Sequence, residues 1–84
     1  MPEYFIVTVR DADRRFEVDL EIPSRLPFSA FKDKLLEILK IMGGRAFQGW
    51  NNYRILFKNY AMQDSDTLAS LGAFDGSRLT AERV

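Results

Sequence analysis

The sequence predicts an α+β domain in which one helix packs against a mixed sheet, with the element order β-β-α-β-β-β. Residues 16–22 (FEVDLEI) alternate strictly between apolar and acidic side chains, as in a strand with one buried face. Residues 28–42 instead carry large apolar side chains at helical spacing. Prolines and glycines fall between these segments, where element boundaries are expected.

Two strands open the chain. Residues 4–9 (YFIVTV) are β-branched and aromatic, which suits a pleated strand, and residues 11–15 (DADRR) are polar turn formers. Because this short loop joins residues 4–9 to the alternating run 16–22, we expect an antiparallel hairpin. Pro23 ends the second strand, since a proline cannot donate a hydrogen bond to the strand ladder.

A single amphipathic helix comes next. Pro27 lies where its fixed φ suits the first helical turn. The predicted apolar stripe consists of Phe28, Phe31, Leu35, Ile38, Leu39 and Met42. Gly43 and Gly44 end the helix by offering a left-handed cap. Since nothing else in the chain can cover the stripe, the helix is expected to lie across one sheet.

The second half of the chain completes the sheet. Residues 43–52 are rich in glycine and asparagine and predict a loop that carries two aromatic side chains. Residues 53–57 (YRILF) predict a third strand, residues 60–62 a short fourth strand and residues 77–84 the last one. The first and last strands are expected to be parallel neighbours, because the connection between them contains the helix.

The segment SDTLASLGAFDGSRL fits neither a long helix nor a strand. Leu68 and Leu71 are expected to anchor one helical turn that plugs the open end of the core. Ser65 or Asp66 caps this turn and Gly72 ends it. The second glycine, in FDGS, makes the tight turn into the last strand.

The overall composition excludes several classes of function. Twelve basic residues offset twelve acidic ones, so the chain lacks the concentrated positive charge that nucleic acid requires. No apolar run approaches the length of a membrane span. Histidine and cysteine are both absent, and with them the commonest general base and metal ligands. We expect a cytoplasmic protein with no nucleic-acid partner, no membrane insertion, no cofactor and no metal.

Catalysis would have to depend on carboxylates. Glu17, Asp19 and Glu21 project from one face of the second strand, about 6.5–7 Å apart along it. Such a row could bind a cation or supply an acid/base pair, although acids on the wet face of a strand more commonly serve solvation. An enzyme would also need a concave acidic pocket, which a domain of this size rarely has. We expect no catalytic residue.

Two stretches together match a known family. In the second half they are YRILFKN, followed by Met62, Asp66-Thr67-Leu68, Leu71 and Leu79. In the first half the stretch is EIPSRLPFSAF, with its Pro-Ser after the second strand. In these features the chain resembles the ubiquitin-like β-grasp family over nearly its whole length. The resemblance implies a single ubiquitin-like domain, residues 1–84, that binds other proteins.

Four features support a narrower resemblance: Y-x-x-V-T-V at the start, V-D-L-E-I-P at 18–23, Trp50, and L-G-x-x-D-G-x-x-L at 71–79. In these the chain is similar to the YukD/EsaB group, the bacterial ubiquitin-like proteins of type VII secretion systems. The resemblance implies a non-conjugated, cytoplasmic accessory protein. Its protein partners would be secretion-system components that export small helical substrates of the WXG type.

Two other interpretations stay open. Conjugatable modifiers and sulfur carriers of this fold end in a free Gly-Gly, whereas this chain ends in Ala81-Glu82-Arg83-Val84. That ending disfavours conjugation unless the native chain is longer. The chain could instead be a generic ubiquitin-like interaction module of a larger signalling protein. The sequence leaves both the identity of the partner and the oligomeric state undetermined.

The docking surface is predicted on the sheet face that points away from the helix. Alternation along the first strand places Tyr4 and Ile6 on this outer face, and Leu56 joins them from the third strand. The family resemblance makes Leu56 the apolar centre of the face. We expect one apolar patch, rimmed by Arg54, Lys58 and the acidic row, with Leu56 and Ile6 as anchors. The alternative is scattered apolar surface residues, which are normal.

Trp50, the single tryptophan, has two interpretations. It can close one edge of the core as a partly buried aromatic side chain. It can also be an exposed binding residue, since tryptophan is enriched among interface hot spots. Trp50 is therefore one of the candidate protein-binding residues.

Overall fold

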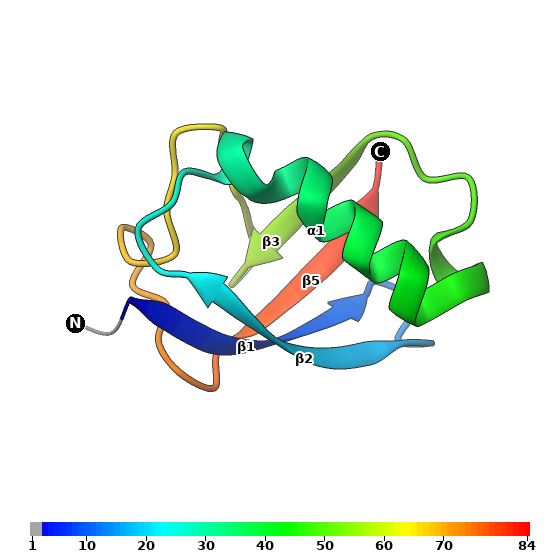
Figure 1. Ribbon diagram of the computed structural model, residues 1–84, viewed down its shortest axis with the longest axis horizontal. Helices are drawn as coiled ribbons and strands as arrows, with labels where there is room; N and C mark the ends of the chain where they lie inside the picture. The colour runs from blue at the N-terminus through cyan, green and yellow to red at the C-terminus, as the bar shows by residue number, and fades with distance from the viewer. Residues whose placement is uncertain (1–2) are drawn as a thin grey trace.

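In residues 3–84, which the computed structural model describes, one α-helix lies across one face of a five-stranded sheet (Figure 1). The elements are β1 (Tyr4–Asp11), β2 (Glu17–Pro23), α1 (Phe28–Gly43), the 3-10 helix η1 (Gly44–Phe47), β3 (Tyr53–Phe57), β4 (Tyr60–Ala61) and β5 (Arg78–Arg83). The α+β class and the element order are as predicted, whereas η1 lies in a segment that the sequence predicts as a loop.

The sheet is mixed and has the strand order β2-β1-β5-β3-β4. β1 and β2 form the expected antiparallel hairpin, and β1 pairs with β5 in parallel. Alternation along β1 buries Phe5, Val7 and Val9 beneath the helix and turns Tyr4 and Ile6 to the opposite face. The period-two pattern therefore correctly predicts which side of β1 meets α1.

The buried side of α1 departs from the predicted stripe at two positions, Leu36 in the middle of the helix and Met42 at its end. Most of the stripe is buried, but Leu36 joins it and Met42 is 51% exposed. Met42 is exposed because η1 places the fully buried ring of Phe47 beside Gly43 in the last helical turn. Gly44 ends the helix with a φ of 53°, as a glycine permits, but its ψ of −115° lies outside the left-handed helical region that was expected of the cap; its N–H donates to the carbonyl of Lys40.

The connector between β4 and β5 contains the expected turn, but its cap is Thr67 rather than the predicted Ser65 or Asp66. Thr67 Oγ1 accepts the N–H of Ser70 at 3.0 Å, and Ser70 Oγ accepts the N–H of Thr67 at 3.0 Å. This reciprocal pair satisfies both ends of the turn locally. The carboxylate of Asp66 instead accepts the hydroxyl of Tyr60 at 2.7 Å.

The same connector completes the start of α1. Among the residues that the structure describes, no side chain caps the helix at Pro27. The N–H groups of Phe28 and Ser29 instead donate to the backbone carbonyls of Asp66 and Asp64, at 2.8 and 3.0 Å. Because the first amides of a helix have no partner within it, these two bonds fix where α1 begins.

Gly43→Ala is expected to destabilise the fold by about 1–3 kcal/mol through overpacking. The φ of Gly43, −96°, suits alanine, but the added Cβ would lie 2.5 Å from the ring of Phe47. Urea unfolding followed by the fluorescence of Trp50 measures the free energy of unfolding. Phe47→Leu is the control background, in which Gly43→Ala should stop being destabilising. An equal cost in both backgrounds would contradict the steric explanation.

In the variant Tyr53→Phe, the free energy of unfolding is expected to fall less steeply at alkaline pH than in the wild type. The hydroxyl of Tyr53 donates to the carbonyl of Lys32 at 2.5 Å, and burial, with a smaller effect of the Asp33 charge, raises the pKa of Tyr53 above its ordinary 10.0. The folded protein therefore retains a proton that the unfolded chain loses above about pH 10, so stability falls as the pH rises through that range.

Urea unfolding of both proteins between about pH 8 and 11 measures this difference. The wild type should start more stable, because it has the hydrogen bond, and should lose more stability than Tyr53→Phe. Stability curves that run parallel over the whole range would show that Tyr53 does not cause the slope.

Candidate functional site

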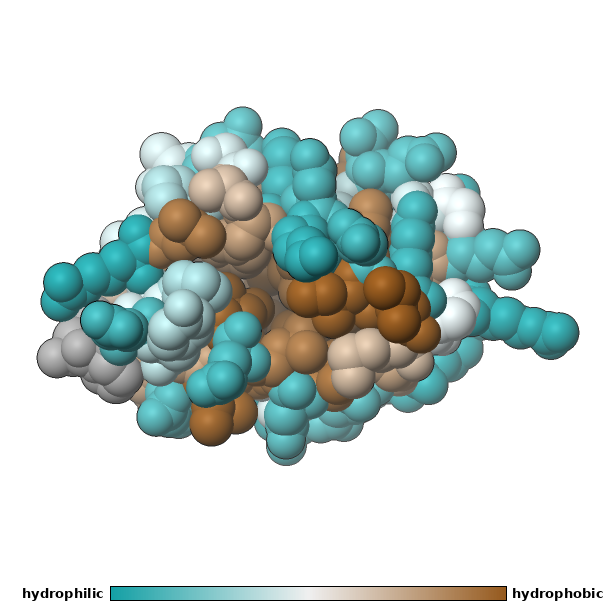
Figure 2. All heavy atoms as spheres, viewed as in Figure 1, coloured by the Kyte–Doolittle hydropathy of each residue, from teal (hydrophilic) through white to brown (hydrophobic). Residues whose placement is uncertain are grey.

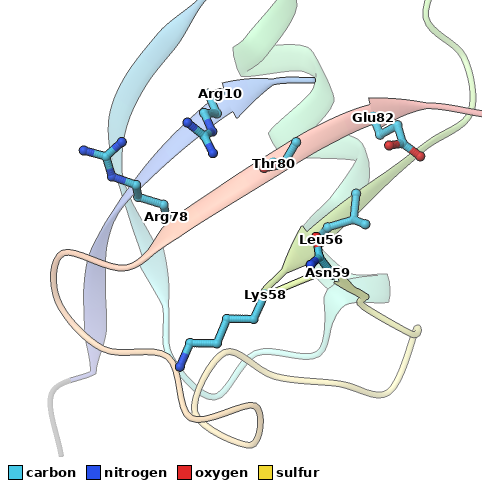
Figure 3. A pocket seen from close by; sticks show the side chains of 7 residues that line it. All are labelled: Arg10, Leu56, Lys58, Asn59, Arg78, Thr80 and Glu82. Carbon is cyan, nitrogen blue, oxygen red and sulfur yellow. The ribbon is translucent and has the colours of Figure 1, made fainter. Parts of the chain in front are cut away.

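The outer face of the sheet, opposite α1, carries an open hollow of about 320 Å³. Its lining residues are Arg10, Leu56, Lys58, Asn59, Arg78, Thr80 and Glu82 (Figure 3). They come from β1, β5, β3 and the turn that follows β3. Figure 3 shows Thr80 and Leu56 between the two arginines on one side and Glu82 on the other.

The strand register explains why these residues meet. Thr80 on β5 is paired with Arg10 on β1 and with Leu56 on β3, so the three side chains form one row across the sheet. Arg78 and Glu82 lie two residues to either side of Thr80 and share its face. Leu56 is partly buried in this row, while its chain neighbours Ile55 and Phe57 point into the core.

The hollow is positively charged. Within residues 3–84, Arg10, Lys58 and Arg78 form no ion pair with any carboxylate. The acidic residue of the hollow, Glu82, is already engaged, because its Oε1 accepts Arg54 Nε at 2.6 Å. Lys58 Nζ lies 5.3 Å from the centroid of its neighbouring Phe57 ring. An apolar Leu56 within unpaired cations suits a partner that offers an apolar side chain close to acidic ones.

The predicted single apolar patch is not formed. Tyr4 and Ile6 are 52% and 51% exposed on the outer face, as expected. However, β5 lies between β1 and β3, and Leu56 is level with Arg10, not with Ile6. Arg10 was not predicted as part of the site, although it shares its parity along β1 with Tyr4 and Ile6.

Trp50 belongs to the core and is corrected as a binding candidate. Its side chain is 8% exposed, and its ring meets Phe47 edge-on with a centroid distance of 4.8 Å. The 3-10 turn of η1 places Phe47 in the core, and Trp50 packs against its ring there. A side chain this deeply buried cannot anchor a partner without unfolding part of the core.

The acidic row of β2 has the character of a solvated strand face. Glu17, Asp19 and Glu21 are exposed, and Asp19 Oδ1 accepts the hydroxyl of Thr8 at 2.7 Å. Within residues 3–84, no group of three or more acidic side chains is arranged to hold a metal ion. In the same part of the chain, α1 is too short and too polar to cross a bilayer.

Known proteins resemble this chain in structure but not detectably in sequence. No family model matches it, and no curated protein does. The ubiquitin-like domain of the type VII secretion system protein EccD1 of Mycobacterium tuberculosis is 22% identical, with a TM-score of 0.76, covering 98% of this chain and 99% of that one. The EccD5 ubiquitin-like domain from Mycobacterium xenopi is 19% identical, with a TM-score of 0.78, covering 99% and 97%.

A third likeness lies within a larger protein of the MycP5-free ESX-5 inner membrane complex. It has a TM-score of 0.79 and 18% identity, and covers 99% of this chain but 21% of that one. At such low identities the likeness concerns the fold. Together with the single helix on a mixed five-stranded sheet, it shows that this chain has the ubiquitin-like β-grasp fold.

Proposed function

We propose that this chain is a non-conjugated ubiquitin-like binding domain that serves type VII protein secretion as an accessory component in the bacterial cytoplasm. Two observations support the secretion role. Two solved ubiquitin-like domains of type VII secretion proteins share the fold over nearly the whole chain. The motifs from Y-x-x-V-T-V to L-G-x-x-D-G-x-x-L independently resemble the YukD/EsaB group. In this role the domain binds a partner and performs no chemistry.

The observation that carries the docking mechanism is the position of Leu56 in a hollow with three cations that have no ion pair among residues 3–84. Leu56 supplies apolar contact at the centre. Arg10, Lys58 and Arg78 attract and orient an acidic partner surface, which affects the association rate and specificity more than the final affinity. Arg54 donates to the carboxylate of Glu82, so this carboxylate does not neutralise the three cations of the hollow.

Leu56→Asp is expected to weaken capture of secretion-system proteins at least tenfold, which corresponds to about 1.4 kcal/mol. The new carboxylate removes the apolar contact and neutralises part of the positive hollow. Tagged protein expressed in the cell that encodes it, followed by quantitative mass spectrometry of the bound material, measures the loss. Circular dichroism verifies that the variant is folded.

Ile6→Asp is the matched control, because Ile6 points to the same face outside the hollow. It should retain capture, and equal losses in both variants would contradict a site centred on Leu56. Capture that depends on Leu56 but contains no secretion protein would overturn the secretion role alone. A ladder of covalent adducts in denaturing gels would overturn the non-conjugated role.

A further inference from the structure

A second surface lies on the other side of the molecule, between β2 and α1. It is a groove of about 280 Å³ whose apolar lining includes Leu20, Ile22, Leu26, Ala30 and Ile38. Figure 2 shows apolar surface gathered around a hollow on this face, bordered by polar side chains. The groove shares no residue with the hollow around Leu56. It therefore goes beyond the function proposed above.

The groove runs beside a free strand edge. β2 is one of the two edge strands of the sheet and, within residues 3–84, pairs only with β1. The N–H of Asp11 donates to the carbonyl of Phe16, and the N–H of Ser24 donates to the carbonyl of Glu3. Even-numbered residues of β2 therefore direct their backbone groups toward β1, because these directions alternate along a strand.

The odd-numbered residues must then direct their backbone groups outward. Glu17, Asp19 and Glu21 each present an N–H and a carbonyl at the edge, and no backbone group among residues 3–84 pairs with them. An edge of this kind is a template for another strand. The side chains of the same three residues lie on the outer face, away from α1.

We propose that this edge takes up an extended segment of a partner protein in which basic and apolar residues alternate. In an added strand, residues opposite Glu17, Asp19 and Glu21 lie on the same face as these carboxylates, where opposite charges stabilise the pairing. The residues between them point toward α1 and enter the apolar groove. Backbone hydrogen bonds supply affinity and the two rows of side chains supply specificity.

A second copy of this chain fits the edge poorly. Two β2 strands paired in antiparallel fashion would bring the acidic rows of both copies against each other, and like charges directly opposite are destabilising. The cation of the groove, Lys34, lies on the helix side and is 3.9 Å from Glu37, so it does not offset the row. Charge therefore selects a basic partner over self-pairing.

The probe is the heptapeptide Lys-Val-Lys-Ile-Lys-Val-Lys, compared with a peptide that has the same residues with the lysines contiguous. The alternating peptide should bind the whole domain at least tenfold more tightly. On binding, amide hydrogen exchange at Glu17, Asp19 and Glu21 should slow, whereas Val18 and Leu20 already donate to β1 and should change little. Equal affinity for both peptides, or protection confined to the hollow around Leu56, would overturn the proposal.

Two variants separate strand pairing from general charge attraction. Glu21→Pro removes one outward N–H and leaves the β1 ladder intact, so it should weaken binding at least tenfold, and Glu21→Gln is its control for the lost charge. Glu17→Lys with Glu21→Lys should reverse the preference, toward the peptide with glutamate in place of lysine.

Ala30→Lys tests the groove without touching the strand, because Ala30 is an exposed helical residue on its wall. It should weaken binding of the lysine peptide several-fold. Unchanged binding in both Glu21→Pro and Ala30→Lys would overturn strand addition here. Formation of a stable homodimer that competes with the peptide would instead identify a second copy as the occupant and overturn the basic partner.

Discussion

Within residues 3–84, a single α-helix packs against a sheet of five strands, and it is too small to cover all of the sheet's apolar surface. The other features of the structure follow from this constraint. α1 buries the middle of one face of the sheet, with Val7, Leu79 and Ala81 inaccessible to solvent beneath it. It cannot also cover the opposite face or the free edge of β2. Both candidate binding surfaces are therefore what a single helix leaves uncovered: the outer face around Leu56 and the edge of β2.

The connector before β5 keeps these surfaces in fixed positions. Its carbonyls at Asp64 and Asp66 complete the first turn of α1, and it also holds β1, because Asp75 Oδ1 accepts the N–H of Ile6 at 2.9 Å. A segment without regular secondary structure thus joins helix and sheet through hydrogen bonds. Because α1 and the sheet are fastened together in this way, the groove between α1 and β2 is ordered before a partner arrives, and an ordered site costs less entropy to fill.

Local patterns predicted the fold well and the site only in part. Alternation in β1 and β2, and helical spacing from Phe28 to Leu39, depend on one element each, so they can be predicted from the sequence. Met42 was assigned to the core because the pattern does not show that Phe47 folds back beneath the last turn. Parity placed Leu56 on the correct face. Its neighbour Arg10 follows from the strand order, which a one-dimensional pattern does not contain.

Pro23 gives the outer edge a definite end. As an odd-numbered residue of β2 it faces outward, and its nitrogen carries no hydrogen to share. At the other end, β2 begins at Glu17, so the edge that can pair with an added strand is short. If an added strand shifted its register by one residue, each of its side chains would point to the opposite face of the sheet. The edge of β2 can therefore distinguish two segments of equal composition that differ only in whether their basic residues occupy the odd or the even positions.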